Sequence, residues 1–146
     1  QEFEARSCRW LVRLQGDVFV RVHAENMRPL PEPEDRARFY VCGGAHRGEI
    51  LRSVEYFDFE RGVWEEAPPM LHRRADALSA AHGGALYVFG GSAGKEALPS
   101  AETWDAASGA SSWRPLADMP TARVNGRTAV LDGFIYVCGG LRWEVA

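Results

Sequence analysis

Short runs of alternating apolar and polar residues, separated by glycine-containing turns, recur along most of the chain. One run has the pattern apolar, Tyr, Val, apolar and paired glycine, and it occurs three times, at 39–44, 86–91 and 135–140. The first glycines of the pairs lie at positions 43, 90 and 139, which are 47 and 49 residues apart. Alternation with a period of two is typical of β-strands. The pattern therefore predicts a repetitive all-β chain.

Three further markers keep the same period. Trp64 and Trp113 are 49 residues apart, and a Glu-x-aromatic-Asp step occurs at 55–58 and again at 102–105. An arginine follows a methionine by four residues in both copies, as Arg74 and Arg123. A period near 50 residues is typical of the blades of β-propellers.

These markers together resemble the kelch repeat between Phe39 and Gly140. The Tyr that usually precedes Asp in kelch repeats is Phe57 in one copy and Trp104 in the other. The resemblance implies an all-β, kelch-type β-propeller fragment, with two nearly complete four-stranded blades plus two strands of a third. In many kelch propellers a strand from the far C-terminus completes the first blade, and the kelch region here opens with a second strand.

The alternation and the turn residues together predict antiparallel strands and their bounds. The expected strands are 9–14, 18–22, 38–44, 53–58, 63–66, 75–81, 85–91, 101–105, 112–116, 127–131 and 134–139. The innermost strand of the second blade, at 75–81, is rich in small residues, because blades crowd together near the central channel.

Residues 1–38 break the repeat and predict a separate organisation. Residues 1–30 contain a β-hairpin around Gly16, and 8–30 resemble the closing strands of a small Tudor-like barrel. Residues 31–38 are rich in Pro and acidic residues and predict a stiff linker. The partial propeller would occupy 39–146, with repeats at about 39–74, 75–123 and 124–146. We expect the chain to be cut from a longer one, whose missing blades would be partners of this part.

Several recurring residues are predicted to have structural roles. The paired glycines allow close backbone approach, Trp64 and Trp113 are expected to lie buried between adjacent blades, and Arg74 and Arg123 are expected to make blade-positioning hydrogen bonds. Cys42 and Cys138 are interpreted as buried, inert thiols within apolar strands. The paired glycines are Gly43, Gly44, Gly90, Gly91, Gly139 and Gly140.

Composition narrows the classes of function. The formal net charge of −3 and a pI near 5.8 argue against binding to nucleic acid, and no apolar run approaches the length needed to span a membrane. Three cysteines and four histidines show no metal-ligand spacing, so we expect no metal and no cofactor. Reduced thiols suit a cytoplasmic location.

Neither a nucleophile elbow nor a phosphate-binding loop occurs, so we predict that the chain is not an enzyme. The kelch resemblance leaves alternatives open, because some relatives are copper-dependent sugar oxidases or sugar epimerases. Most kelch relatives instead bind protein segments, as substrate adaptors of cullin-type ubiquitin ligases or as actin-associated cytoskeletal scaffolds. A protein-interaction module, with a protein or peptide as ligand, is therefore the preferred interpretation.

The binding residues should lie on loops, because loops on a rigid scaffold carry recognition. The alternative for each one is an ordinary solvated surface residue. Asp76 and Asn125 are singled out because they occupy the same position in successive repeats but differ in residue type. The predicted contacts are His46, Arg47, Arg52, His72, Arg73, Asp76 and Asn125, with Glu49, Lys95 and Glu96 beside them.

Overall fold

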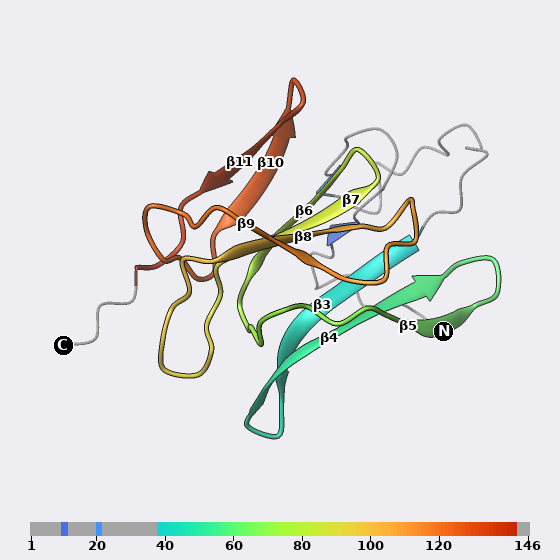
Figure 1. Ribbon diagram of the computed structural model, residues 1–146, viewed down its shortest axis with the longest axis horizontal. Coiled ribbons are helices and arrows are strands. Elements are labelled where there is room, and N and C mark those ends of the chain that lie inside the picture. The colour runs from blue at the N-terminus through green and yellow to red at the C-terminus, as the bar shows by residue number, and fades with distance from the viewer. Residues whose placement is uncertain (1–9, 12–19, 22–37, 143–146) are drawn as a thin grey trace, which may run out of the picture.

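The computed structural model describes residues 10–11, 20–21 and 38–142, with only the backbone for the first four (Figure 1). Strand β1 (Trp10–Leu11) pairs antiparallel with β2 (Val20–Arg21), and Trp10 lies opposite Arg21. The rest of the predicted hairpin, the Tudor-like segment and nearly all of the predicted linker lie outside the described residues.

Residues 38–142 form three antiparallel sheets, and they contain no helix. The fold is all-β, as the alternation predicted. Blade I is β3 (Arg38–His46), β4 (Glu49–Asp58) and β5 (Val63–Ala67). Blade II is β6 (Leu78–His82), β7 (Ala85–Phe89), β8 (Ala101–Asp105) and β9 (Arg114–Leu116). Blade III is β10 (Arg127–Leu131) and β11 (Phe134–Cys138).

The hairpin of blade I is longer than the sequence predicted. Its pairing continues past an irregularity between Cys42 and Gly44 and ends in a two-residue turn, Arg47–Gly48. Both turn residues have positive φ, 49° and 85°, which is the pattern of the hairpin turns that match strand twist. The loop expected between residues 44 and 53 is therefore mostly strand.

The innermost strand of blade II is shorter than predicted. It begins at Leu78 and not at Ala75, because Asp76 has a φ of 53° and turns the chain. Ala75 forms only an isolated bridge, with Ser92. Strand β7 ends before Gly90 and Gly91, whose φ values are also positive. Strand β9 begins at Arg114, two residues later than the sequence predicted.

The main core lies between blades I and II. Tyr40 of blade I packs edge-on against Trp104 of blade II, with ring centroids 5.9 Å apart. Trp104 stacks on Trp113 at 6.1 Å, and Val54 and Met70 belong to the same cluster of buried residues. Burial of large aromatic rings at this boundary joins the two blades into one body.

Two residues that were predicted to be buried, Trp64 and Cys138, are exposed. Trp113 is 3% exposed and its indole N–H donates to the Pro68 carbonyl of blade I at 2.7 Å, whereas Trp64 is 52% exposed. Trp64 has the same position in its blade, but no described blade covers that side of blade I. Cys138 is likewise exposed, because blade III has only two described strands.

The first glycine of the pair makes room for the connection to the next blade in blades I and II, whereas Gly139 of blade III has no atom within 4 Å of the place of a Cβ. A Cβ atom on Gly43 would lie 2.3 Å from the carbonyl oxygen of Arg74, and one on Gly90 would lie 2.3 Å from that of Arg123. Contacts this close do not occur, so any side chain would displace the connection. The recurring glycine is therefore required by packing as well as by its positive φ.

Candidate protein-interaction face

The connection between blades I and II is held by backbone hydrogen bonds from blade I. The amide of Met70 donates to the Arg52 carbonyl, and that of Arg74 donates to the Leu51 carbonyl, both at 2.9 Å. The Arg74 carbonyl accepts from the Gly44 amide at 2.9 Å. The segment that carries His72 and Arg73 is thus fixed at both ends to one edge of blade I.

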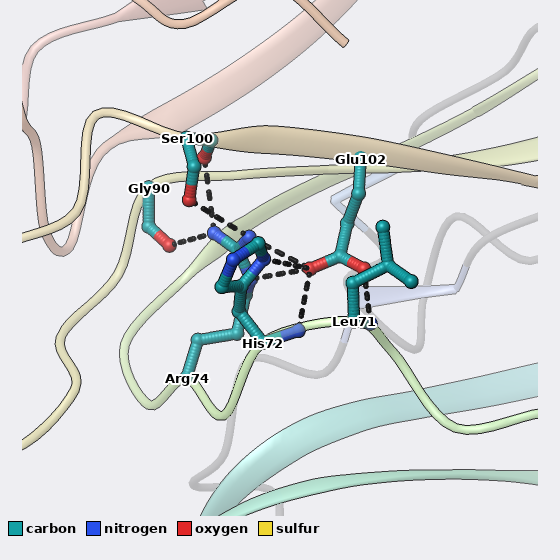
Figure 2. Close-up of polar contacts among 6 residues, drawn as sticks. All are labelled: Leu71, His72, Arg74, Gly90, Ser100 and Glu102. Carbon is teal, nitrogen blue, oxygen red and sulfur yellow. Dashed lines mark hydrogen bonds and ion pairs between the residues drawn. The ribbon is translucent and has the colours of Figure 1, made fainter. Parts of the chain in front are cut away.

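The side chain of Arg74 fixes the same segment to blade II (Figure 2). Its Nε and Nη2 atoms donate to Glu102 Oε1 at 2.9 and 2.7 Å, and Nη1 donates to the carbonyls of Gly90 and Ser100 at 2.6 and 3.0 Å. Nη2 also donates to the Ser100 hydroxyl at 3.1 Å. Both charged side chains are completely buried. Paired charges with satisfied hydrogen bonds are the condition under which such burial is tolerated.

Glu102 was not singled out from the sequence, although it completes this arrangement. Its carboxylate also accepts from the amides of Leu71 and His72, at 2.6 and 3.4 Å, so it holds the backbone of the connection directly. The sequence did contain a signal for this residue, because Glu55 and Glu102 occupy the same position in successive repeats. Glu55 is exposed in blade I, because no described connection reaches it.

Arg123 repeats only part of the Arg74 arrangement. Its carbonyl accepts from the Gly91 amide at 2.9 Å, which matches the bond between Arg74 and Gly44. Its Nη1 atom donates to the Gly139 carbonyl at 2.7 Å, which matches the bond from Arg74 to Gly90. Both arginines therefore make hydrogen bonds that connect neighbouring blades.

The connections between blades and the turns after the second strands lie at one end of the blades. In Figure 1 the β3–β4 turn and the loop between β7 and β8 are at the lower end, opposite the β6–β7 and β10–β11 turns. Backbone bonds link the loops at this end: the Asn125 amide donates to the Asp76 carbonyl at 3.0 Å, and Ala75 and Ser92 exchange two bonds. We call residues 46–52, 71–76, 92–98 and 122–125 the interaction face.

All seven predicted contact residues are exposed and belong to this face. His46 and Arg52 lie in strands and not in a loop as expected, because the β3–β4 ladder extends to the turn. Arg47 lies in that turn. The structure brings His72 and Arg73 to the edge of the same hairpin, where Arg73 Nη1 donates to the Ile50 carbonyl at 3.0 Å.

Asp76 and Asn125 occupy equivalent places just before the innermost strands of blades II and III. Both have left-handed backbone conformations, with φ of 53° and 56°. Asp and Asn tolerate this region better than most residues, so a backbone requirement accounts for the choice of small polar side chains. Their side chains remain exposed at the interaction face.

Two features of the described residues bear on the chemistry that they could carry. No group of three or more His, Cys, Asp or Glu side chains within them could hold a metal ion. Cys42 packs against the core, and burial raises the pKa of its thiol to about 12, so the nucleophilic thiolate is scarce at neutral pH. No helix in this part of the chain could cross a membrane.

The fold and this face define a repeat protein of the propeller class. Its framework residues recur from blade to blade, whereas the exposed residues of the interaction face differ. The family model for the kelch motif matches residues 38–71 and 73–120, and the chain belongs to that family. These two segments correspond to blade I with its connection and to blade II.

Several curated proteins are similar to the chain. Human Kelch-like protein 33 is 38% identical over 107 residues, covering 71% of this chain and 20% of that protein. Rat Kelch-like protein 38 is 34% identical over 106 residues, covering 69% and 18%. Human Kelch repeat and BTB domain-containing protein 13 is 32% identical over 104 residues, covering 69% and 22%. The chain thus spans about a fifth of the length of these relatives.

Proposed function

We propose that this chain is part of a protein-binding propeller, and that the interaction face contacts a segment of another protein. The observation that carries the proposal is the separation of constant and variable residues. Residues that recur between blades, such as Arg74 and Gly90, make the hydrogen bonds and close contacts of the framework. The exposed residues of the face differ between blades, as expected where a rigid scaffold displays specific contacts.

A finer proposal is that the longer protein is a cytoplasmic substrate adaptor of a ubiquitin ligase and has no catalytic activity of its own. The name of one relative combines kelch repeats with a BTB domain. The adaptors among kelch proteins carry such a domain, whereas the described residues offer only the binding part. The propeller would then hold the substrate while another domain contacts the ligase.

The test is a comparison of the proteins captured by the full-length protein and by two variants of the face. Asp76→Asn removes a charge while keeping a residue that tolerates a left-handed backbone, and Arg73→Gln removes a guanidinium. We expect both variants to lose the same captured proteins, and to melt at nearly the unchanged temperature, because surface substitutions usually change stability by less than about 0.5 kcal/mol.

The control is Arg61→Gln, at the opposite end of blade I, where Arg61 pairs with Glu65. This variant should retain every captured protein. If both face variants retain all of them as well, the interaction face is not the binding surface. Capture of a cullin subunit with the wild-type protein would support the adaptor role, and its consistent absence would contradict that role while leaving protein binding intact.

A further inference from the structure

We propose that the open side of blade I binds a protein segment that carries two cationic side chains, an arginine and a second basic residue two positions before it. This surface is separate from the interaction face, and the inference does not rest on the proposed function. It consists of a row of aromatic rings beside two facing carboxylates. We call Phe39, Phe57, Trp64, Glu55 and Glu66 the open-side surface.

The aromatic row crosses all three strands of blade I. Phe39 of β3 lies opposite Phe57 of β4, and Phe57 lies opposite Trp64 of β5. The ring centroids of Phe39 and Trp64 are 6.0 Å apart, and those of Phe57 and Trp64 are 5.5 Å apart. Because Trp64 is half exposed, the row leaves apolar area for a partner to cover.

Two carboxylates lie beside this row. Glu55 of β4 is two residues from Phe57, and it lies directly opposite Glu66 of β5. Side chains in such positions have Cβ atoms about 5 Å apart, and like charges there are destabilising. Both residues are exposed, and neither forms an ion pair within the described part of the chain. A cationic ligand would relieve this repulsion.

Blade II shows how a surface of this kind is covered. Trp104 and Trp113 occupy the places that Phe57 and Trp64 have in blade I, and both are buried. The Trp113 indole donates to the carbonyl of Pro68, in the connection between blades I and II. The open-side surface therefore has the composition of a surface that a connecting segment covers.

The basic side chains that reach this side of blade II come from the same connection. Glu102, the counterpart of Glu55, accepts two hydrogen bonds from the Arg74 guanidinium, and His72 Nδ1 lies 3.7 Å from its Oε1 atom (Figure 2). Such a segment thus brings two basic side chains, two positions apart, to one carboxylate.

Blade I differs from blade II in its number of carboxylates. The residue opposite Glu102 is Pro115, whereas the residue opposite Glu55 is Glu66. One arginine balances the charge of Glu102, but two facing carboxylates need two full positive charges. Lysine and arginine carry such a charge at neutral pH, whereas histidine carries it only in part. The ligand that matches blade I therefore has Lys or Arg where the connection has His72.

The same charges disfavour other occupants. Two copies of the open-side surface in a symmetric contact would bring four carboxylates together, which is unfavourable. Nucleic acid would be repelled, because its phosphates are also negative. An arginine, in contrast, both pairs with carboxylates and stacks on aromatic rings. The aromatic row and the facing carboxylates thus favour the same ligand.

The test measures binding of labelled peptides to the whole chain by fluorescence anisotropy. The peptides have the sequence of residues 68–76, because this connection covers the equivalent side of blade II. Gln replaces Arg73 in all of them, since this side chain contacts the Ile50 carbonyl of blade I. The first has no further change, the second has His72→Lys, and the third has Arg74→Gln.

We expect the His72→Lys peptide to bind about two- to fivefold more tightly than the first peptide at pH 8, as is typical of exposed ion pairs. Its affinity should fall as salt is raised. At about pH 5.5 the first peptide should approach it in affinity, because histidine is then charged. The Arg74→Gln peptide should bind most weakly at both pH values.

Variants of the chain locate the binding surface. Glu66→Gln should abolish the preference for the His72→Lys peptide, and Glu55→Gln should weaken binding of every peptide. Glu96→Gln removes the same charge from the loop between β7 and β8 and should change neither. Glu66→Gln should unfold in urea at the wild-type midpoint or above it, because it removes a like-charge pair. Its altered binding would therefore not reflect unfolding.

The inference is overturned if no peptide binds, if the three peptides bind equally, or if Glu66→Gln keeps the preference for lysine. It is also overturned if Glu96→Gln weakens binding as much as Glu55→Gln does. These outcomes would leave the proposed function intact, because that function is tested by capture of partner proteins with variants of the interaction face.

Discussion

Replacing Arg74 with Met should destabilise the protein severely, because this substitution removes one member of a buried ion pair. The side chain of Arg74 donates to Glu102, Ser100 and Gly90, and both it and Glu102 are fully buried. After the substitution the Glu102 carboxylate keeps the amides of Leu71 and His72 as donors, and His72 Nδ1 lies 3.7 Å from Oε1. Removing one partner of such a pair costs about 3–5 kcal/mol.

The repeat provides a matched control in Arg123→Met. Arg123 is only half-buried, and its side chain makes one hydrogen bond, to the Gly139 carbonyl. Its loss should cost about 0.5–1.5 kcal/mol. The two variants should therefore differ by roughly 2–4 kcal/mol.

The assay is urea unfolding of the 146-residue chain, followed by tryptophan fluorescence. With a urea dependence of about 1–3 kcal/mol per molar, the midpoint of Arg74→Met should lie at least about 1 M below that of Arg123→Met. The double variant Arg74→Met/Glu102→Leu should recover much of the loss, because apolar replacement of both partners is often neutral. Equal midpoints for Arg74→Met and Arg123→Met would refute the reasoning.

Four other predictions concern the buried and exposed side chains of the blades. Trp113→Ala should cost about 3–5 kcal/mol, while Trp64→Ala should cost much less because this side chain is half exposed; equal losses in urea unfolding would contradict this difference. At pH 8 a disulfide reagent should modify Cys138 faster than Cys42, whose thiol has a pKa of about 12. Since the unfolded thiol ionises near pH 8.5 and the folded one near pH 12, Cys42 should also make stability fall as pH rises between these values; a C42A variant that lost stability equally would argue against this. Finally, the open apolar sides of blades I and III should make the isolated chain self-associate as its concentration rises, and light scattering that shows a monomer at every concentration would contradict that expectation.

Local sequence was sufficient for the fold class and for most of the strands. Alternation, turn residues and a period near 50 are properties of short segments, so the β10 and β11 strands were predicted to within one residue. The positive φ of Gly90 likewise follows from the residue type and the recurring motif. The interaction face could also be assembled in outline, because every blade places the same connection at the same end.

Tertiary structure decided what depends on neighbouring blades. Trp64 and Trp113 are identical in the repeat, yet one is exposed and the other buried, because burial requires a blade on the adjoining side. The partnership of Arg74 with Glu102 joins residues 28 positions apart and is created only when the connection folds across blade II. The hydrogen bond from Arg73 to the Ile50 carbonyl has the same origin. Residue type and spacing determine which strands form, whereas contacts between distant segments determine which side chains are buried, paired or left free to bind.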